Sequence, residues 1–431
     1  MITPRRLPPR VPNFARLSVL TAGQQALAAV AGILIVRSLP KDDYAQYSVT
    51  LGIVAAIVAV ADAGVISTIM AEGGKLTDNR SAMLRLMRDG SRFRRVSYGL
   101  SALAFAPVLI YLLIGTKAEP GVLMLALALA MVTSFTSTTS AIYQATLRLE
   151  YRLTSVAFVL LGGAAIRCLL VVLAAYSFGS QVSFLILLTL TAIVTPAEAW
   201  FLRRLLGQLP ALEKTTSAHR TAFRRNALRQ VPNSIFFVAQ GLILPLILIG
   251  VGNPLAIAEV NALSRYSIGF VVLASTITQI FMTRLARTRE HTHLRIVYSQ
   301  AVVLYISFGV AGLAIIVFAA PALLTILGDQ YQGLGTELAI ISLGGLVGGL
   351  VAVLAALNQA RAWLRLAWVQ IPLATVWITI LLLVIRPFDA YSAAWFAALV
   401  AVPGIFSMAL CAWLGMRDDR RRSEPTDSAE A

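Results

Sequence analysis

The stretch that decides the fold is Leu17 to Met70, which reads LSVLTAGQQALAAVAGILIV, then RSLPKDDY, then AQYSVTLGIVAAIVAVADAGVISTIM. The first apolar run, Leu17 to Val36, is followed by a short polar hinge, Arg37 to Tyr44. The second run, Ala45 to Met70, contains a single acid, Asp62. A helix needs about 20 apolar residues to cross the hydrocarbon of a bilayer. The stretch therefore predicts a hairpin of two transmembrane helices.

The composition predicts that the whole chain is a membrane protein. Of its 431 residues, 58% are hydrophobic and 13% are charged, and the mean hydropathy is +0.79. This is more apolar surface than one soluble core could bury. The apolar runs are continuous, whereas the strands of a membrane barrel would alternate over about 10 residues. We therefore predict an all-α polytopic membrane protein, with the first run retained as a helix because it is too long for the core of a signal peptide.

The net charge of +16 has an explanation that does not involve nucleic acid. Arg and Lys gather in the loops that stay in the cytoplasm during insertion. The cysteines, Cys168 and Cys411, lie in predicted spans, and the histidines, His219, His291 and His293, lie in basic loops without ligand spacing. We therefore expect no disulfide framework, no metal site and no cofactor.

Hydropathy predicts twelve spans in two six-helix bundles. The spans cover residues 17–36, 45–70, 96–115, 121–147, 155–175, 183–201, 232–251, 260–282, 296–318, 334–357, 366–385 and 392–414. The domains are then a basic cytoplasmic leader (1–16), an N-terminal bundle (17–201), a basic cytoplasmic connector (202–231), a C-terminal bundle (232–414) and a disordered cytoplasmic tail (415–431).

The positions of the basic residues set the predicted topology. Of the 36 Lys and Arg residues, four fall in outer turns and two, Arg167 and Arg265, fall inside spans. The others fall in the leader, the tail and the loops on one side, which places both termini in the cytoplasm. One of these loops, before the third span, alternates arginines with apolar residues from Met83 to Phe93. It is predicted to be either a short helix on the membrane surface or a solvated connector.

The two predicted halves share local features. Pro12-Asn13 precedes the first span and Pro232-Asn233 precedes the seventh, and Gln24-Gln25 has a counterpart in Gln240. Two parallel repeats related by an axis along the membrane normal are a transporter design, in which the substrate passes between the halves. The sequence therefore indicates a six-plus-six repeat.

Polar residues form two stripes inside the predicted spans. Steps of three, four or seven residues place the members of a stripe on one face of a helix. The stripe in the eighth span consists of Asn261, Arg265, Gly269, Thr276, Gln279 and Thr283. The stripe in the fourth span consists of Thr133, Thr136 or Ser137, Ser140 and Gln144. The first span adds Thr21, Gln24 and Gln25, with Arg37 at its outer end.

Charged side chains in hydrocarbon are costly, so each is a candidate functional residue. One interpretation is a hydrated cavity whose arginines attract an anion. The cavity residues would be Arg265, Arg167, Arg37, Gln24, Gln25, Asn261, Gln279 and Gln144. The alternative is that Arg167 pairs with a buried acid, Asp62 or Glu198, or reaches to an interface, and that the stripes are packing seams. Asp62 and Glu198 are candidates for coupling to H+ or Na+, or for structural acids.

Enzyme function is not expected. No loop exceeds about 30 residues, and we find no phosphate-binding glycine loop, no zinc spacing and no nucleophile motif. A membrane glycosyltransferase that uses a polyprenyl-linked donor would keep acids in its first outer loop, where Asp42 and Asp43 lie. That loop is short, however, and the outer face has no sizeable domain to hold an acceptor.

Four stretches carry a resemblance to a known family. They are Arg37 to Pro40, Tyr44 to Tyr47, Asp62 to Gly64, and Leu327 to Tyr331. On these stretches the chain resembles the polysaccharide transporter branch, the Wzx-type oligosaccharide flippases, of the multidrug/oligosaccharidyl-lipid/polysaccharide (MOP) exporter superfamily. The resemblance implies two six-helix bundles in a V around a central cavity, which alternates between inward-open and outward-open states.

The resemblance also implies a substrate and a location. The substrate would be an oligosaccharide on undecaprenyl diphosphate, moved from the cytoplasmic to the outer leaflet of the bacterial cytoplasmic membrane. Membrane lipids and polysaccharide polymerase or other glycan assembly proteins would be partners. Cavity arginines suit a diphosphate because each guanidinium donates two bonds at once. The alternatives are a cation-coupled multidrug exporter of the same superfamily, which would use acids in its cavity, and a noncatalytic scaffold in a glycan assembly complex.

Overall fold

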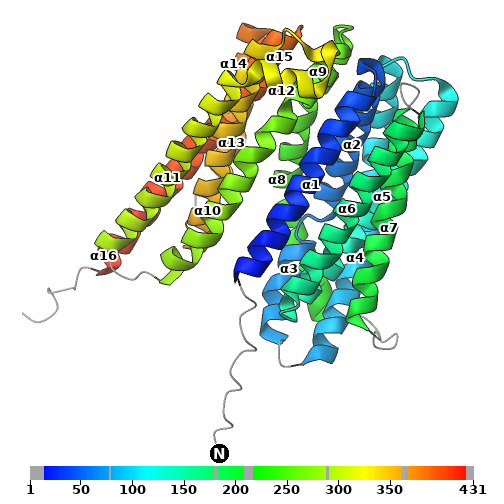
Figure 1. Cartoon of the computed structure of the whole chain (residues 1–431). Helices are drawn as coiled ribbons and strands as arrows, with labels where there is room; N and C mark the ends of the chain where they lie inside the picture. The colour runs from blue at the N-terminus through cyan, green and yellow to red at the C-terminus, as the bar shows by residue number, and fades with distance from the viewer. Residues whose placement is uncertain are drawn as a thin grey trace, which may run out of the picture. The chain divides into compact units, whose positions relative to one another are not determined.

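The computed structural model describes residues 14–76, 79–178, 183–207, 217–287, 291–361, 363 and 367–423 (Figure 1). Every regular element in these residues is a helix. Within this described part, eleven helical segments are long and apolar enough to cross a membrane. The prediction of an all-α polytopic membrane protein is confirmed.

Contacts divide the chain into two compact units, Met1–Pro254 and Leu255–Ala431. The helices of unit 1 are α1 (Phe14–Ser38), α2 (Lys41–Ala61), α3 (Val65–Gly73), the 3₁₀ turn η1 (Gly74–Leu76), α4 (Arg80–Gly115), α5 (Pro120–Leu149), α6 (Leu153–Phe178), α7 (Phe184–Leu206) and α8 (Ser217–Gly250). Within this unit α1 packs on α6, α5 packs on α7, and α2 packs on α4 and α5.

Unit 2 is built around α13. Its elements are α9 (Leu255–Leu263), η3 (Ser264–Ser267), α10 (Ile268–Arg287), α11 (His291–Phe318), α12 (Ala320–Leu327), η4 (Asp329–Tyr331), α13 (Gly335–Ala360), η5 (Ala367–Val369), α14 (Gln370–Ile385), α15 (Ala390–Leu399) and α16 (Val402–Ser423). Helices α10, α11, α15 and α16 all pack against α13. The eleventh predicted span corresponds to α14, whose 16 residues extend only about 24 Å.

The border between the units differs from the predicted domain border. The seventh apolar helix, α8, packs against α2, α3 and α4, so unit 1 extends to Pro254. Residues 217–231 of the predicted connector form the first turns of α8, and residues 208–216 lie outside the described part. The six-plus-six repeat stays a prediction.

The loop predicted before the third span is part of a helix. Helix α4 runs without interruption for 36 residues, and Met83, Leu84, Leu86 and Met87 in its first turns are buried. The two predictions for this loop, a surface helix and a solvated connector, are therefore wrong. The reason is that these apolar side chains pack against α3 and α8 instead of facing lipid or water.

The two chain ends also differ in part from expectation. Helix α16 continues to Ser423, so the prediction of disorder from residue 415 is wrong for residues 415–423. Residues 424–431, and residues 1–13 of the predicted leader, lie outside the described part.

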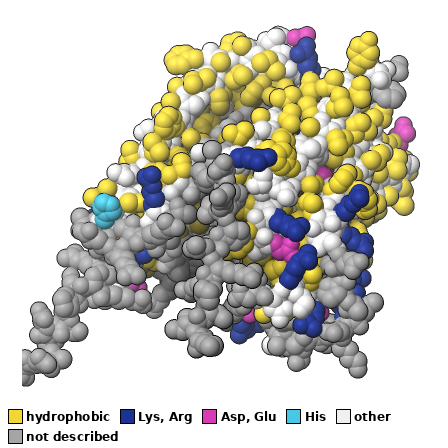
Figure 2. All heavy atoms as spheres, turned by 60° about the horizontal axis from the view of Figure 1, so that its bottom comes forward, with side chains coloured by type: hydrophobic (Ala, Val, Ile, Leu, Met, Phe, Trp, Pro, Cys, Tyr) yellow, Lys and Arg dark blue, Asp and Glu magenta, His cyan; other side chains and the backbone are white. Residues whose placement is uncertain are grey.

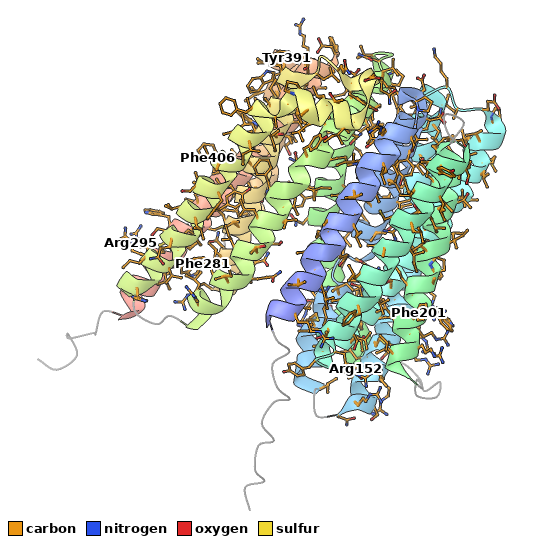
Figure 3. All side chains as sticks on the ribbon, viewed as in Figure 1. Arg152, Phe201, Phe281, Arg295, Tyr391 and Phe406 are labelled. Carbon is orange, nitrogen blue, oxygen red and sulfur yellow. The ribbon has the colours of Figure 1, made fainter. Side chains whose placement is uncertain are left out.

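Arginines hold the end of α7. Arg152 Nη1 donates to the Leu205 carbonyl over 2.7 Å, and Arg80 Nη2 donates to the Leu206 carbonyl over 2.7 Å (Arg152 is labelled in Figure 3). Glu150 pairs with both arginines, over 2.8 Å to Arg80 and 3.5 Å to Arg152. Cations there satisfy the last carbonyls and complement the helix dipole. Figure 2 shows Lys and Arg side chains gathered at this end of unit 1.

Candidate functional site

A buried ion pair joins α2 to α4 in unit 1. Asp62 follows the last residue of α2, and its Oδ1 contacts Nη2 of Arg94, which lies midway along α4. The side chains of Arg94 and Asp62 are 4% and 20% exposed. A charge at such a depth has to be paired. Asp62, predicted to be a coupling or structural acid, is therefore an ion-pair partner in the structure.

A turn interrupts the helix directly after α2. Residues 62–64 form a turn in which Gly64 has φ 78° and ψ −11°, the left-handed region that glycine adopts without steric cost. The turn separates α2 from α3, which has only nine residues. The second predicted span is thus not one continuous helix to Met70.

Helix α8 docks on this turn through side-chain hydrogen bonds. The Gly64 amide donates to Gln230 Oε1 over 3.1 Å, and Gln230 Nε2 donates to Ser67 Oγ over 2.9 Å. One turn earlier in α8, Asn226 Nδ2 donates to Thr68 Oγ1 over 2.9 Å. The part of the chain predicted to be a loop therefore holds the α2–α3 turn from the side.

A second ion pair joins α6 to α7. Arg167 Nη2 lies 3.3 Å from Glu198 Oε1, and the two side chains are 29% and 14% exposed. Of the two interpretations of Arg167, pairing with Glu198 is the one that the structure shows. A contact of Arg167 with substrate stays a prediction.

An apolar groove of about 410 Å³ runs beside this pair, between α6 and α7. We call it the Glu198 groove. Its lining residues are Phe158, Val159, Gly162, Gly163, Ile166, Leu170, Ile193, Val194, Ala197, Glu198 and Phe201 (Phe201 is labelled in Figure 3). A Cβ atom at Gly163 would lie 1.8 Å from Glu198 Oε1, so this position of the carboxylate requires a glycine there.

Part of the polar stripe of the fourth predicted span packs inside unit 1. Thr136 Oγ1 lies 3.0 Å from Thr195 Oγ1 of α7, and Gln144 Nε2 donates to Ser140 Oγ over 3.2 Å. Thr133 and Ser140 are buried. The interpretation as a packing seam accounts for these contacts, and Gln144 is half-buried among them.

The stripe of the eighth predicted span does not follow one continuous α-helix. Residues 264–267 form the 3₁₀ turn η3, which advances about 120° per residue instead of about 100°. Asn261 and Arg265, at or before this break, are half-buried. Gly269, Thr276 and Gln279 are exposed together on α10. The side chain of Thr283 lies outside the described part. The stripe is therefore two shorter groups.

The remaining predicted residues lie on α1. Gln24 and Gln25 are half-buried along this helix, and Arg37 is exposed in its last turn. Asp42 and Asp43, which the glycosyltransferase alternative would need, lie in the first turn of α2, where acids complement the helix dipole.

The residues that sequence reasoning missed are Arg94, Asn226, Gln230 and Gly163. One signal for Arg94 was available, because Met83, Met87, Gly90 and Arg94 follow one another at helical spacing and all four are buried in α4. Their spacing marks a buried helix face that contains an arginine, and such an arginine needs an acid. The contacts of Asn226 and Gln230 span more than 150 positions and left no local signal.

Comparisons with known proteins bear on the fold. No protein-family model and no curated protein matches the sequence. Among solved structures, the lipid II flippase MurJ in an inward closed conformation is similar with a TM-score of 0.68 and 12% identity, over 94% of this chain and 90% of that one. An inward-facing multidrug resistance MATE family transporter of the MOP superfamily is similar with a TM-score of 0.64 and 15% identity, over 93% of this chain and 96% of that one.

A third solved structure is a MOP superfamily transporter from Pyrococcus furiosus, described by a reverse polarity of its binding pocket. It gives a TM-score of 0.59 and 12% identity, over 95% of both chains. All three similarities extend over nearly the whole length, at identities that show the fold alone. The chain is a multi-pass membrane protein with the fold of the MOP superfamily transporters.

Proposed function

We propose that the protein is a transporter that moves a polyprenyl-diphosphate-linked oligosaccharide from the cytoplasmic to the outer leaflet of a bacterial cytoplasmic membrane by alternating access. The fold shared with a lipid II flippase supports this proposal. Both termini would lie in the cytoplasm, and glycan assembly proteins such as a polysaccharide polymerase would be its partners. Moving a lipid-linked glycan across a bilayer requires no covalent step, so the proposed protein is not an enzyme.

The observation that carries the choice of an anionic substrate is the pairing of the two candidate coupling acids. Asp62 is paired with Arg94 and Glu198 with Arg167. An exporter of organic cations would use a carboxylate that its substrate can neutralise, and here arginines already neutralise both. The exposed Arg37 is suited to a diphosphate, because its guanidinium can donate two parallel bonds.

A cation-coupled multidrug exporter is the second candidate function. The similarity to a MATE family transporter is of the same quality as the similarity to the flippase. One observation in the structure favours it, because the Glu198 groove combines an apolar wall with a carboxylate. A hydrophobic cation would compete with Arg167 for that carboxylate.

Deletion of the gene separates the candidates. The flippase proposal predicts that lipid-linked oligosaccharide accumulates on the inner leaflet and that the wild-type gene reverses this. Hypersensitivity to cationic drugs without accumulation would favour the exporter. If export persists in both Arg265→Ala and Arg37→Ala strains, whose proteins remain inserted and folded, these arginines do not contact the head group.

A further inference from the structure

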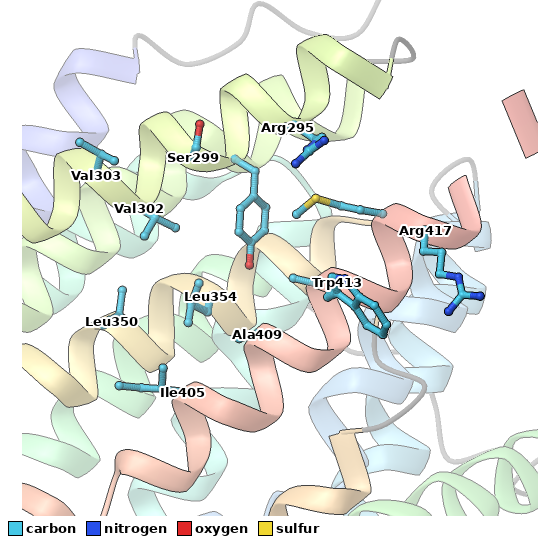
Figure 4. A pocket seen from close by; sticks show the side chains of 13 residues that line it. Arg295, Ser299, Val302, Val303, Leu350, Leu354, Ile405, Ala409, Trp413 and Arg417 are labelled. Atoms are coloured by element: carbon cyan, nitrogen blue, oxygen red, sulfur yellow. The ribbon is translucent and has the colours of Figure 1, made fainter. Parts of the chain in front are cut away.

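Unit 2 contains a groove whose lining includes none of the predicted cavity residues. It lies between α11, α13 and α16 and has a volume of about 650 Å³ (Figure 4). Its walls are apolar, and side chains from all three helices form them, among them Val302, Val303, Leu350, Leu354, Ile405 and Ala409. All three helices are candidate membrane spans, so the groove would lie at the level of the bilayer.

The polar groups along the groove have partners inside the protein. Tyr298 Oη donates to Asn358 Oδ1 over 3.3 Å, and Asn358 Nδ2 donates to the Met408 carbonyl over 2.8 Å. The Ser299 hydroxyl donates to the Ile296 carbonyl over 3.0 Å. The groove body therefore offers a ligand little besides apolar contact.

Two arginines lie at one end of the groove, one from each side. Arg295 belongs to the first turns of α11 and Arg417 to the last turns of α16, and both are exposed. Trp413 lies beside them, with its ring centroid 5.8 Å from Cζ of Arg417. Trp and Arg at the end of a span are typical of the membrane interface. Asp418 follows Arg417 but does not line the groove.

We propose that this groove binds an anionic phospholipid of the surrounding bilayer, with one acyl chain along the apolar wall and its phosphate between Arg295 and Arg417. The charges favour this occupant, because two arginines at the interface attract a phosphate that carries net negative charge. A zwitterionic lipid would offer the same chain with no net charge. The site is independent of the transported substrate proposed above.

Native mass spectrometry of the full-length protein in detergent tests this site, with phosphatidylglycerol and phosphatidylcholine as probes. The wild type is expected to retain phosphatidylglycerol in preference to phosphatidylcholine. Each of Arg295→Gln and Arg417→Gln is expected to weaken retention about fivefold, and the double variant more. Arg284→Gln is the matched control, since Arg284 is also exposed, stacks on Phe281 and does not line the groove.

A second pair of variants tests the apolar part. Ala409→Phe fills the groove and is expected to reduce retention while both arginines remain, whereas Leu410→Phe, next to it and outside the groove, is not. Thermal unfolding identifies any variant that fails to fold. If Ala409→Phe does not fold, the retention of lipid by the arginine variants alone tests the site. Equal retention of both lipids, or no loss in the double arginine variant, would overturn the proposal. So would a dimer that Ala409→Phe dissociates, because a second copy would then occupy the groove.

Discussion

Arg94 of α4 is paired with Asp62 at the turn between α2 and α3, and only 4% of its side chain is exposed. The pair ties the end of one span to the middle of another. Helix α8 holds the same turn through Gln230. Helices α2, α4 and α8 therefore meet at this turn.

Loss of either partner should destabilise unit 1. Arg94→Gln and Asp62→Asn each leave a buried charge without its partner, at an expected cost of about 3–5 kcal/mol. The double variant should cost clearly less than the sum of the two single variants. Thermal unfolding in detergent measures all three. Arg95→Gln, at the neighbouring exposed position, should be close to neutral. Equal costs for Arg94→Gln and Arg95→Gln would contradict the pairing.

The docking of α8 predicts a local effect. Gln230→Ala removes the acceptor of the Gly64 amide and the donor to Ser67, two bonds at an exposed position, so we expect a cost of about 0.5–1.5 kcal/mol for each. Hydrogen exchange of the Gly64 amide should speed up, while that of amides in the middle of α5 should not. Leu228→Ala, an exposed residue of the same helix, is the control. Unchanged exchange at Gly64 would show that α8 does not hold the turn.

Two adjacent glycines provide a matched pair. Gly163→Ala places a Cβ 1.8 Å from Glu198 Oε1 and should break the pair with Arg167, at a cost of about 1–3 kcal/mol. Nothing lies within 4 Å of a Cβ at Gly162, so Gly162→Ala should be tolerated. Thermal unfolding measures both. A second change, Glu198→Ala, should relieve the clash in Gly163→Ala. Equal behaviour of the two glycine variants would contradict the position of Glu198.

The N-cap of α15, which lies outside the spans, predicts that stability depends on pH. Asp389 precedes α15, and the hydroxyl and backbone N–H of Ser392 donate to its carboxylate, which lowers the pKa of Asp389 below its usual value. The ionised cap therefore stabilises α15 above the unfolded pKa of about 3.9, and this contribution is lost as the pH falls through the lower folded pKa. Asp389→Ala should cost about 1 kcal/mol at pH 7 and less in acid.

The control for this cap is Glu119→Ala, since Glu119 precedes α5 and makes no capping hydrogen bond with its side chain. Thermal unfolding at pH 7 and near pH 3 compares the two variants. Glu119→Ala should have little effect at either pH. A cost of Asp389→Ala that stays constant with pH would show that the ionised carboxylate does not stabilise the helix.

Hydropathy predicted the fold class because length and apolar content alone define a membrane span. The runs 17–36 and 296–318, for example, lie within α1 and α11. What failed was the assumption that each run is one uniform helix. The turn at Gly64 separates α2 from α3, so the second predicted span is not one helix. The 3₁₀ turn η3 changes the rotation per residue after Leu263, so the stripe through Arg265 could not be projected along α10. Neither break changes the hydropathy.

The candidate site was predicted in part. The sequence offers the pairing of Arg167 with Glu198 as one alternative, because both residues are charged and lie in neighbouring predicted spans. The arginines around Arg94 favour a loop at this position, and its contact with Asp62 depends on tertiary packing between α2 and α4. The sequence does not predict the contacts made by Gln230, for the same reason.

Transbilayer movement by the purified protein in vesicles tests the proposed flippase activity directly. The substrate is a polyprenyl-diphosphate oligosaccharide whose glycan carries a fluorophore, and a membrane-impermeant quencher reports the leaflet that holds it. We expect the wild type to move the lipid faster than empty vesicles do, and Arg265→Gln to slow this movement without loss of folded protein. Movement no faster than in empty vesicles, together with uptake of an organic cation driven by a proton or sodium gradient, would contradict the flippase proposal.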